Sequence, residues 1–256
     1  MDLPEYQHRF KTAVVDRDSQ GVMTVRLHSK GETLWWGGLP HRELAELFGA
    51  IAGDRANLAV VITGTGDRFI AMPEGGTGAL AAGRITASAW DEIIREGHRL
   101  VSNLLDIEVP TIAAVNGPVV VHSEIAVLCD IVLCTPETFF QDAAHFPGGL
   151  VPGDSMQVIW PLLLGPNRGR YFLLTGQALH AAEALERGVV GEVVEGDRLL
   201  ARALELAADL AGRNPVLLRY TRHALARPLR RAMAHDLHTG LALEAIASLA
   251  AGDIDD

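Results

Sequence analysis

The chain has 256 residues, of which 48% are hydrophobic and 21% are charged, a balance typical of a globular protein with a full core. A net charge of −10 argues against nucleic acid as a partner, because a phosphate backbone requires a basic face. No apolar run is long enough to span a membrane, no signal-peptide pattern is visible, and the two cysteines are typical of buried thiols, so we expect a cytoplasmic protein without a membrane partner.

The first half of the chain alternates predicted strands with predicted helices. Alternating apolar residues predict a half-buried strand at 22–28, and a continuous apolar run predicts a strand buried on both faces at 58–63. Apolar residues at helical spacing predict helices at 41–52 and 89–105. Residues 67–88 are rich in glycine, alanine and proline, and we expect a loop there.

The second half continues this pattern and then becomes helical. We expect strands at 111–115 and 131–134, with a short helix at 123–128 between them. The remaining predicted elements are helices at 156–164, 168–174 and 181–187, an extended piece at 189–194, and helices at 197–211, 215–226 and 229–251.

This order of elements indicates the α/β fold class. Strands that alternate with helices favour a parallel sheet with right-handed crossovers. The repeated unit is strand, strand, helix, and it is followed by helices only. The helical tail is therefore a candidate subdomain or oligomer arm.

The segment at residues 140–154 combines candidate catalytic groups with tight turns. It places His145 nine positions before Asp154, with proline and glycine residues between them that can bring its ends together. An imidazole held by a carboxylate has a fixed tautomer and a raised basicity, so it can take a proton from water. The segment contains no serine or cysteine, and Ser155 directly after it is better placed to start a helix. This pattern favours activated water over a covalent intermediate.

Five ordered motifs resemble the crotonase (enoyl-CoA hydratase/isomerase) superfamily. They occupy residues 60–69, 110–117, 129–133, 151–153, and 174–177 followed by 181–190. The resemblance implies a spiral of repeated ββα units over residues 1–195 and a C-terminal helical trimerisation region over residues 196–256. It also implies a homotrimer or a dimer of trimers.

Three positions depart from the acyl-CoA site of that superfamily. Most members hold a thioester oxygen between two backbone N–H groups. By counting, Pro73 falls where the first donor is expected, and proline has no N–H. His122 lies in the stretch where other members carry glycines, and His145 falls near a catalytic carboxylate of the hydratases. These departures disfavour ordinary enoyl-CoA hydratase chemistry.

The departures resemble one branch of the superfamily, the β-diketone hydrolases of the 6-oxocamphor hydrolase type. The matching pieces are residues 33–36 with His41, 90–94, His122 after 116–118, the segment with His145 and Asp154, 167–176 and 240–244. The branch implies retro-Claisen cleavage of a carbon–carbon bond in a small cyclic diketone, without a metal or an organic cofactor. It implies catalytic roles for His145, Asp154, His122 and Glu244, and substrate binding by Trp36 and His41.

Each of these residues also has a plainer interpretation. Asp154 can be the N-cap of the helix that follows it. His122 can be a satisfied core group, Trp36 a core aromatic residue and His41 part of the first turn of its helix. Glu244 can be a solvated carboxylate on a helix surface.

Three other function classes are compatible with the sequence. The first is an acyl-CoA hydratase or isomerase with an altered oxyanion hole. The second is a hydrolytic metal site, which the spacing of the histidines and acids does not favour. The third is a non-enzymatic interaction protein on the same scaffold.

Overall fold

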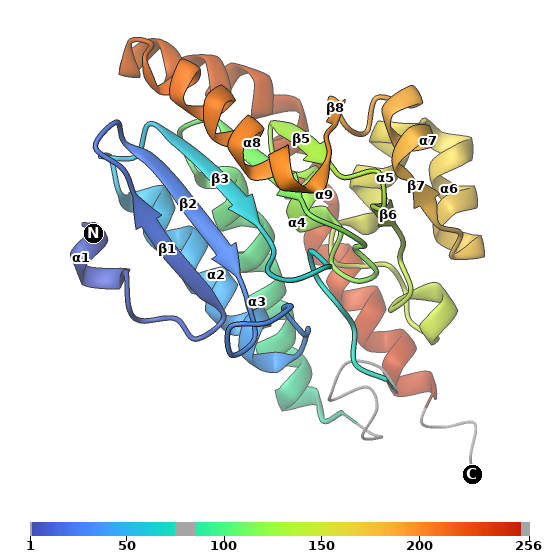
Figure 1. Cartoon of the computed structure of the whole chain (residues 1–256). Helices are drawn as coiled ribbons and strands as arrows, with labels where there is room; N and C mark the ends of the chain where they lie inside the picture. The colour runs from blue at the N-terminus through green and yellow to red at the C-terminus, as the bar shows by residue number, and fades with distance from the viewer. Residues whose placement is uncertain (1, 75–84, 252–256) are drawn as a thin grey trace.

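The computed structural model describes residues 2–74 and 85–251 and is built on a six-stranded sheet with the order β1-β2-β3-β4-β5-β8 (Figure 1). The antiparallel pair β1 (Ala13–Arg17) and β2 (Val22–Leu27) opens it. Every later neighbour is parallel, through β3 (Ala59–Thr63), β4 (Thr111–Val115), β5 (Ile131–Cys134) and β8 (Glu192–Val193). A second, antiparallel sheet pairs β6 (Phe139–Phe140) with β7 (Leu179–His180).

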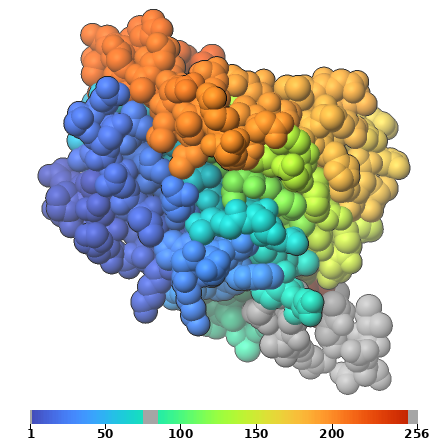
Figure 2. All heavy atoms as spheres, in the orientation of Figure 1, coloured from blue at the N-terminus to red at the C-terminus, as the bar shows by residue number. Residues whose placement is uncertain are grey.

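Helices cover both faces of the main sheet. In β3, Val60 and Ile62 face the large core that includes α2 (Gly38–Gly53) and α3 (Ala87–Asp106). The alternate residues of that strand pack against α8 (Gly196–Ala211), which presents Leu199, Ala203 and Ala207. Figure 2 shows the orange segment that contains α8 adjoining the blue and cyan atoms of the N-terminal part of the chain. Burial on both faces explains why the strand reads as a continuous apolar run.

The remaining helices surround this core. They are α1 (Leu3–Tyr6), α4 (Glu124–Val127), α5 (Met156–Leu164), α6 (Pro166–Thr175), α7 (Ala181–Glu186) and α9 (Pro215–Ala251), with a 3₁₀ turn at Phe146–Gly148. Among the residues that the structure describes, no helix is both long and apolar enough to cross a bilayer. Cys129 and Cys134 are buried free thiols, and Cys129 lies between α4 and β5 rather than in the strand with Cys134.

The structure confirms the α/β class and the parallel sheet, and it corrects three local predictions. Strand β1 was not expected, and α3 begins at Ala87, inside the predicted loop at 67–88. Residues 75–84 of that loop lie outside the described residues. The expected break between helices at residues 227–228 is absent, because α9 continues through Pro228.

Tertiary contacts explain why α9 is continuous. Pro228 removes one helical hydrogen bond, but it is exposed, so water can satisfy the freed carbonyl. Arg222 and Arg230 lie on either side of it, and both donate hydrogen bonds to the carbonyl of Leu105 at the end of α3. The two halves of α9 are therefore held to one point of a neighbouring helix.

Candidate active site

The six candidate side chains come from distant parts of the chain and meet beside one cavity. Trp36 follows β2, His41 lies in the first turns of α2, and His122 lies between β4 and α4. The cavity, about 150 Å³, is lined by Trp36, His41, His122, Asp154 and Glu244, together with Ile85, Trp90, Ile93, Glu96, Leu241 and two glycines. His145 does not line it but contacts Asp154 and Glu244, which do.

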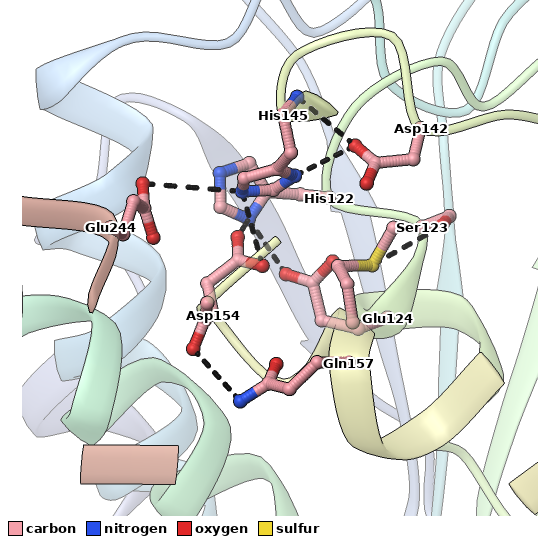
Figure 3. A network of polar contacts seen from close by, with 10 residues as sticks. His122, Ser123, Glu124, Asp142, His145, Asp154, Gln157 and Glu244 are labelled. Carbon is pink, nitrogen blue, oxygen red and sulfur yellow. Dashed lines mark hydrogen bonds and ion pairs between the residues drawn. The ribbon is translucent and has the colours of Figure 1, made fainter. Parts of the chain in front are cut away.

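Three carboxylates surround the imidazole of His145 (Figure 3). Its Nδ1 lies 2.7 Å from Oδ1 of Asp142, which also accepts the backbone N–H of His145. On the other side of the ring, Nε2 lies 3.3 Å from Oδ1 of Asp154 and 4.0 Å from Oε1 of Glu244. Because Asp142 accepts the Nδ1–H, the neutral ring carries its lone pair on Nε2.

Asp142 is the orienting partner that the sequence analysis missed. The spacing of the loop pointed to Asp154, which lies on the Nε2 side of the ring at a longer distance. The signal for Asp142 is its position three residues before His145, in the connection between β6 and the 3₁₀ turn. Such short spacing lets a loop carboxylate bond both the backbone and the ring of the same histidine.

The imidazole of His122 is held by Glu124, by the Asp154 that also contacts His145, and by an aromatic ring. Its Nδ1 lies 2.6 Å from Oε1 of Glu124 and 3.2 Å from Oδ2 of Asp154. The ring of Trp36 lies against it, with 3.8 Å between the ring centroids. The backbone at His122 has φ +50°, a left-handed conformation that is uncommon outside glycine and that local contacts must hold in place.

His41 belongs to the same group of rings. Its ring centroid lies 6.0 Å from that of His122, and its Nδ1 lies 3.0 Å from Oε2 of Glu96 on α3. Both His41 and Glu96 line the cavity. Glu96 was not identified from the sequence, where it reads as one more polar position of an amphipathic helix.

The ionisation states follow from burial and from the close charges. Burial by itself lowers the pKa of His145, but Asp154 and Asp142 outweigh it and raise that pKa well above 6.5. Burial raises the pKa of Asp154, but His145 and His122 outweigh it and hold that pKa far below its ordinary value of 3.8. Burial raises the pKa of Glu244 to about 8, against the opposing effect of His145. At neutral pH the site therefore contains an imidazolium, a carboxylate and a carboxylic acid.

Four buried carboxylate oxygens have no hydrogen-bond partner among the described residues. They are Oε2 of Glu124, Oδ2 of Asp142, Oε2 of Glu244 and Oδ1 of Asp154, the last of which has only its ion-pair contact with Nε2 of His145. Buried polar atoms are rarely left unpaired in folded proteins. Their concentration at one point indicates a site that water or a polar ligand completes.

Two plainer interpretations of the acidic residues are wrong. The N-cap of α5 is Ser155, with φ +87°, so Asp154 is the residue before the cap. Glu244 is not solvated, because it is only 7% exposed. Glu244 on α9 comes close to Asp154 because two glycines, Gly153 and Gly240, let the two segments touch. A Cβ on Gly153 would lie 2.1 Å from the carbonyl oxygen of Gly240.

In the described part of the loop after β3, residues 64–74, two positions cannot offer a free backbone N–H to a ligand. The backbone N–H of Ala71 donates to the carbonyl of Leu34, and Pro73 has no N–H. Trp36 in turn donates its backbone N–H to the carbonyl of Ala71, which fixes its indole beside His122. Trp36 and His122, whose side chains carry N–H groups, both line the cavity.

Three of the acidic and basic groups could in principle hold a cation. His122, Glu124 and Asp154 each offer a ligand atom, and these atoms lie within 4.8 Å of one another. At 2.6 Å, however, His122 and Glu124 form a direct hydrogen bond, which leaves no room for an ion between those two atoms. The geometry favours a proton over a metal at this point.

A larger cavity, of about 430 Å³, lies elsewhere, along α9 and the end of α3. It is lined by charged residues that include Arg219, Arg222 and Arg230. These arginines form ion pairs with Glu108, Asp130 and Asp106, respectively. These three arginines of α9 therefore face the protein's own acids, and among the described residues this cavity lacks the buried imidazoles of the candidate site.

Comparison with known proteins assigns the chain to a family. The family model described as enoyl-CoA hydratase/isomerase matches residues 20–245. The chain belongs to the enoyl-CoA hydratase/isomerase family. Its fold is accordingly the crotonase fold that the five sequence motifs predicted.

Individual relatives differ in their described activities. A β-diketone hydrolase from the cyanobacterium Anabaena sp. PCC 7120, solved with (S)-3-oxocyclohexyl acetic acid, is 41% identical, with 99% of each chain covered and a TM-score of 0.92. A short-chain-enoyl-CoA hydratase from Clostridium acetobutylicum is 29% identical over 79% of this chain and 75% of its own. The fatty acid oxidation complex subunit alpha of Shewanella loihica is 29% identical over 80% of this chain, which spans 29% of that longer protein.

Proposed function

We propose that this crotonase-fold protein is a hydrolase that cleaves a carbon–carbon bond of a small cyclic β-diketone by retro-Claisen hydrolysis. One observation carries the proposal: a buried histidine, enclosed by Asp142, Asp154 and Glu244, adjoins a cavity that presents His122 and Trp36. The 41% identity to a β-diketone hydrolase across 99% of the chain supports this substrate class.

His145 acts as the base that activates water. Asp142 on Nδ1 leaves Nε2 as the basic nitrogen, and Nε2 and Glu244 are 4.0 Å apart, a separation that one water molecule can bridge. The neutral ring takes a proton from this water as its oxygen adds to one carbonyl carbon of the diketone. The raised pKa makes the ring a strong base, but it also means that only the fraction deprotonated at a given pH can act.

His122 and Trp36 stabilise the negative charge that develops on the substrate. Addition of hydroxide makes a tetrahedral oxyanion, whose collapse breaks the carbon–carbon bond and leaves an enolate on the second carbonyl. In this proposal the side-chain N–H groups of His122 and Trp36, which line the cavity, donate to these oxygens in place of the usual backbone pair. Removal of one such donor typically lowers kcat by about 10²- to 10³-fold.

Protonation of the enolate carbon completes the reaction. The imidazolium of His145 holds the proton taken from water, and Glu244, whose burial raises its pKa to about 8, is a second acid beside the cavity. The products are a carboxylate and a ketone in one molecule, a keto acid. The diketone accepts the electrons of the broken bond, so the proposed reaction requires no organic cofactor or metal.

Hydrolysis of a bicyclic 1,3-diketone in ¹⁸O-labelled water tests the proposal. We expect a keto acid with one labelled carboxylate oxygen, detected by mass spectrometry. Turnover that persists after chelation would remove the metal alternative. If a panel of cyclic diketones is left intact while crotonyl-CoA is hydrated, the proposal is wrong.

A second candidate function is chemistry on an acyl-CoA thioester. The relatives from Clostridium acetobutylicum and Shewanella loihica favour it, because both are described as enzymes of enoyl-CoA or fatty acid metabolism. Calorimetric titration with CoA and crotonyl-CoA separates the two functions. Binding of either would support this second candidate.

A further inference from the structure

Glu124 is a fully buried carboxylate that the mechanism above does not use. It lies in the first turn of α4 with no exposed surface, two residues after His122. One of its oxygens contacts Nδ1 of His122 at 2.6 Å, and the other has no partner among the described residues. In the proposed mechanism His122 must donate a hydrogen bond to the substrate. The position of the proton between Glu124 and Nδ1 of His122 therefore affects what the ring can donate.

The acids near His122 are concentrated on one side of the ring. Glu124 and Asp154 both face Nδ1, at 2.6 and 3.2 Å. Nε2 has no hydrogen bond to any described residue and is not among the enclosed, unpaired atoms, and His122 lines the cavity. Nε2 is therefore the ring nitrogen available to a substrate oxygen.

The number of protons on the Glu124–His122 pair decides what Nε2 offers. With two protons, either the acid donates to Nδ1 of a neutral ring or the carboxylate accepts from an imidazolium. In both arrangements Nε2 carries a hydrogen. With one proton, the carboxylate accepts from Nδ1–H and Nε2 presents a lone pair, which repels a carbonyl oxygen.

We propose that Glu124 is a positioning residue that keeps a hydrogen on Nε2 of His122, so that this ring serves as a hydrogen-bond donor to the substrate carbonyl and oxyanion. This inference rests on the proposed diketone hydrolysis for the identity of the carbonyl. The backbone at His122 supports this inference. Its left-handed conformation, φ +50°, belongs to the turn in which Nδ1 of the ring meets the carboxylate of Glu124.

The electrostatics of the site favour the doubly protonated pair. Burial raises the pKa of Glu124, which favours the acid form, with His122 opposing. Burial lowers the pKa of His122, but Glu124 and Asp154 outweigh it and raise that pKa. The other groups that influence this ring are His145, His41 and Glu244, from three further elements.

The nitrogen chemical shifts of His122 test the placement of the proton without any substrate. In protein labelled with ¹⁵N-histidine, long-range ¹H–¹⁵N spectra distinguish a protonated ring nitrogen from a bare one, and His122→Ala identifies the signals by their loss. We expect Nε2 of His122 to carry a hydrogen in the wild-type protein between about pH 7 and pH 8, just above the pH at which an ordinary histidine loses its proton. A neutral ring with hydrogen on Nδ1 alone would overturn the inference.

Two substitutions of Glu124 extend the test. In Glu124→Gln the amide N–H can donate to Nδ1 in place of the acid, so we expect Nε2 to stay protonated and activity to remain within about fivefold. In Glu124→Leu the ionised Asp154 is the remaining partner of Nδ1, so the neutral ring moves its hydrogen there. We expect kcat to fall about 10- to 100-fold. This loss is smaller than the roughly 10²- to 10³-fold loss expected when the donor side chain itself is removed.

Controls separate positioning from a general structural role. If Glu124→Leu acts through His122, adding it to His122→Ala should lower kcat by less than about threefold more. Unchanged His122 shifts in Glu124→Leu would overturn the inference. If the leucine variant does not fold, the wild-type and glutamine spectra decide alone. Because the spectra need no substrate, absence of diketone turnover would count against the proposed function and not against this result.

Discussion

At the scale of single residues, Asp142 and Asp154 hold His145 from opposite sides and should have different functions. Asp142 contacts Nδ1 at 2.7 Å and sets the tautomer, whereas Asp154 contacts Nε2 at 3.3 Å and adds charge. In Asp142→Asn the amide can donate to Nδ1 and place the hydrogen on Nε2. We expect kcat to fall by about 10²- to 10⁴-fold, as when a catalytic histidine is held in the wrong tautomer.

Asp154→Asn is the matched comparison in steady-state kinetics. It should lower kcat more than it raises KM, because Asp154 influences the base and the oxyanion donor rather than binding alone. An equal loss in binding alone would contradict the assignment of Asp154 to the base. Full activity of Asp142→Asn would show that Asp142 does not set the tautomer.

The pH dependence of kcat/KM should report the raised pKa of His145. The base is active only when neutral, and its two acids raise its pKa well above 6.5. Activity should therefore rise with pH through a value above 6.5. The charge of Asp154 raises the pKa of His145 more than the charge of Asp142 does, so Asp154→Asn should move this rise in activity to lower pH. A rise at or below pH 6.5 in the wild-type enzyme would exclude His145 as the base.

Glu244 should make folding stability depend on pH. Burial raises its pKa to about 8 in the folded protein, against 4.5 for the unfolded chain. Between these values the folded state binds more protons, so the unfolding free energy falls as pH rises. Glu244→Gln cannot ionise, and its stability should fall less between pH 5 and pH 8, by about 1 kcal/mol or more. Urea unfolding at the two pH values measures this, and equal slopes for the two proteins would contradict it.

At the scale of elements, the site depends on the close approach of the segment before α5 to α9. Gly153 touches Gly240 so closely that a Cβ would lie 2.1 Å from a carbonyl oxygen and 3.0 Å from Cβ of Glu244. Gly153→Ala must therefore push the segment away from α9 and separate Asp154 from Glu244. We expect about 1–3 kcal/mol of destabilisation and a loss of activity.

A matched glycine provides the control for this element contact. A Cβ on Gly196, at the start of α8, would meet only Cγ2 of Thr135, at the ordinary distance of 3.8 Å. Gly196→Ala should leave activity and thermal unfolding nearly unchanged. Equal behaviour of the two variants would show that the approach to α9 is not sterically limited.

At the scale of the whole molecule, the exposed apolar side chains of α9 favour self-association. They are Val216, Leu217, Tyr220, Leu225, Leu243, Ile246 and Leu249. Apolar exposure of this extent along one helix is typical of a surface that another chain covers. Size-exclusion chromatography with light scattering should give the mass of a trimer or of a dimer of trimers. A monomer at micromolar concentration would contradict this expectation.

Substitution on that helix should weaken the assembly. Tyr220 and Leu225 are 71% and 73% exposed, so Tyr220→Lys with Leu225→Lys should leave the fold of one chain intact while lowering the assembled mass. Val14→Lys, on β1, changes an exposed apolar residue on another element and is the control. The division of the chain at residue 195 into a core and a trimerisation region stays a prediction until such variants are measured.

The amino-acid sequence by itself determined the most strongly apolar elements. Strands β4 and β5 and helix α5 were predicted with the bounds that the structure has, because their apolar runs are long and end at turn or polar residues. The five sequence motifs indicated the family, and the family model confirmed it. The sequence also pointed to His145, Asp154, His122, Glu244, Trp36 and His41 as one group, and the structure brings all of them together.

The tertiary structure decided which acid holds which histidine. Asp142, Glu124 and Glu96 carry no periodic signal, since a carboxylate in a loop or helix looks the same in sequence whether it faces water or an imidazole. The continuity of α9 through Pro228 was also a tertiary matter, set by two arginines on the end of α3. Local periodicity reflects burial along one element, whereas partners and charges depend on atoms that come together only when distant segments pack.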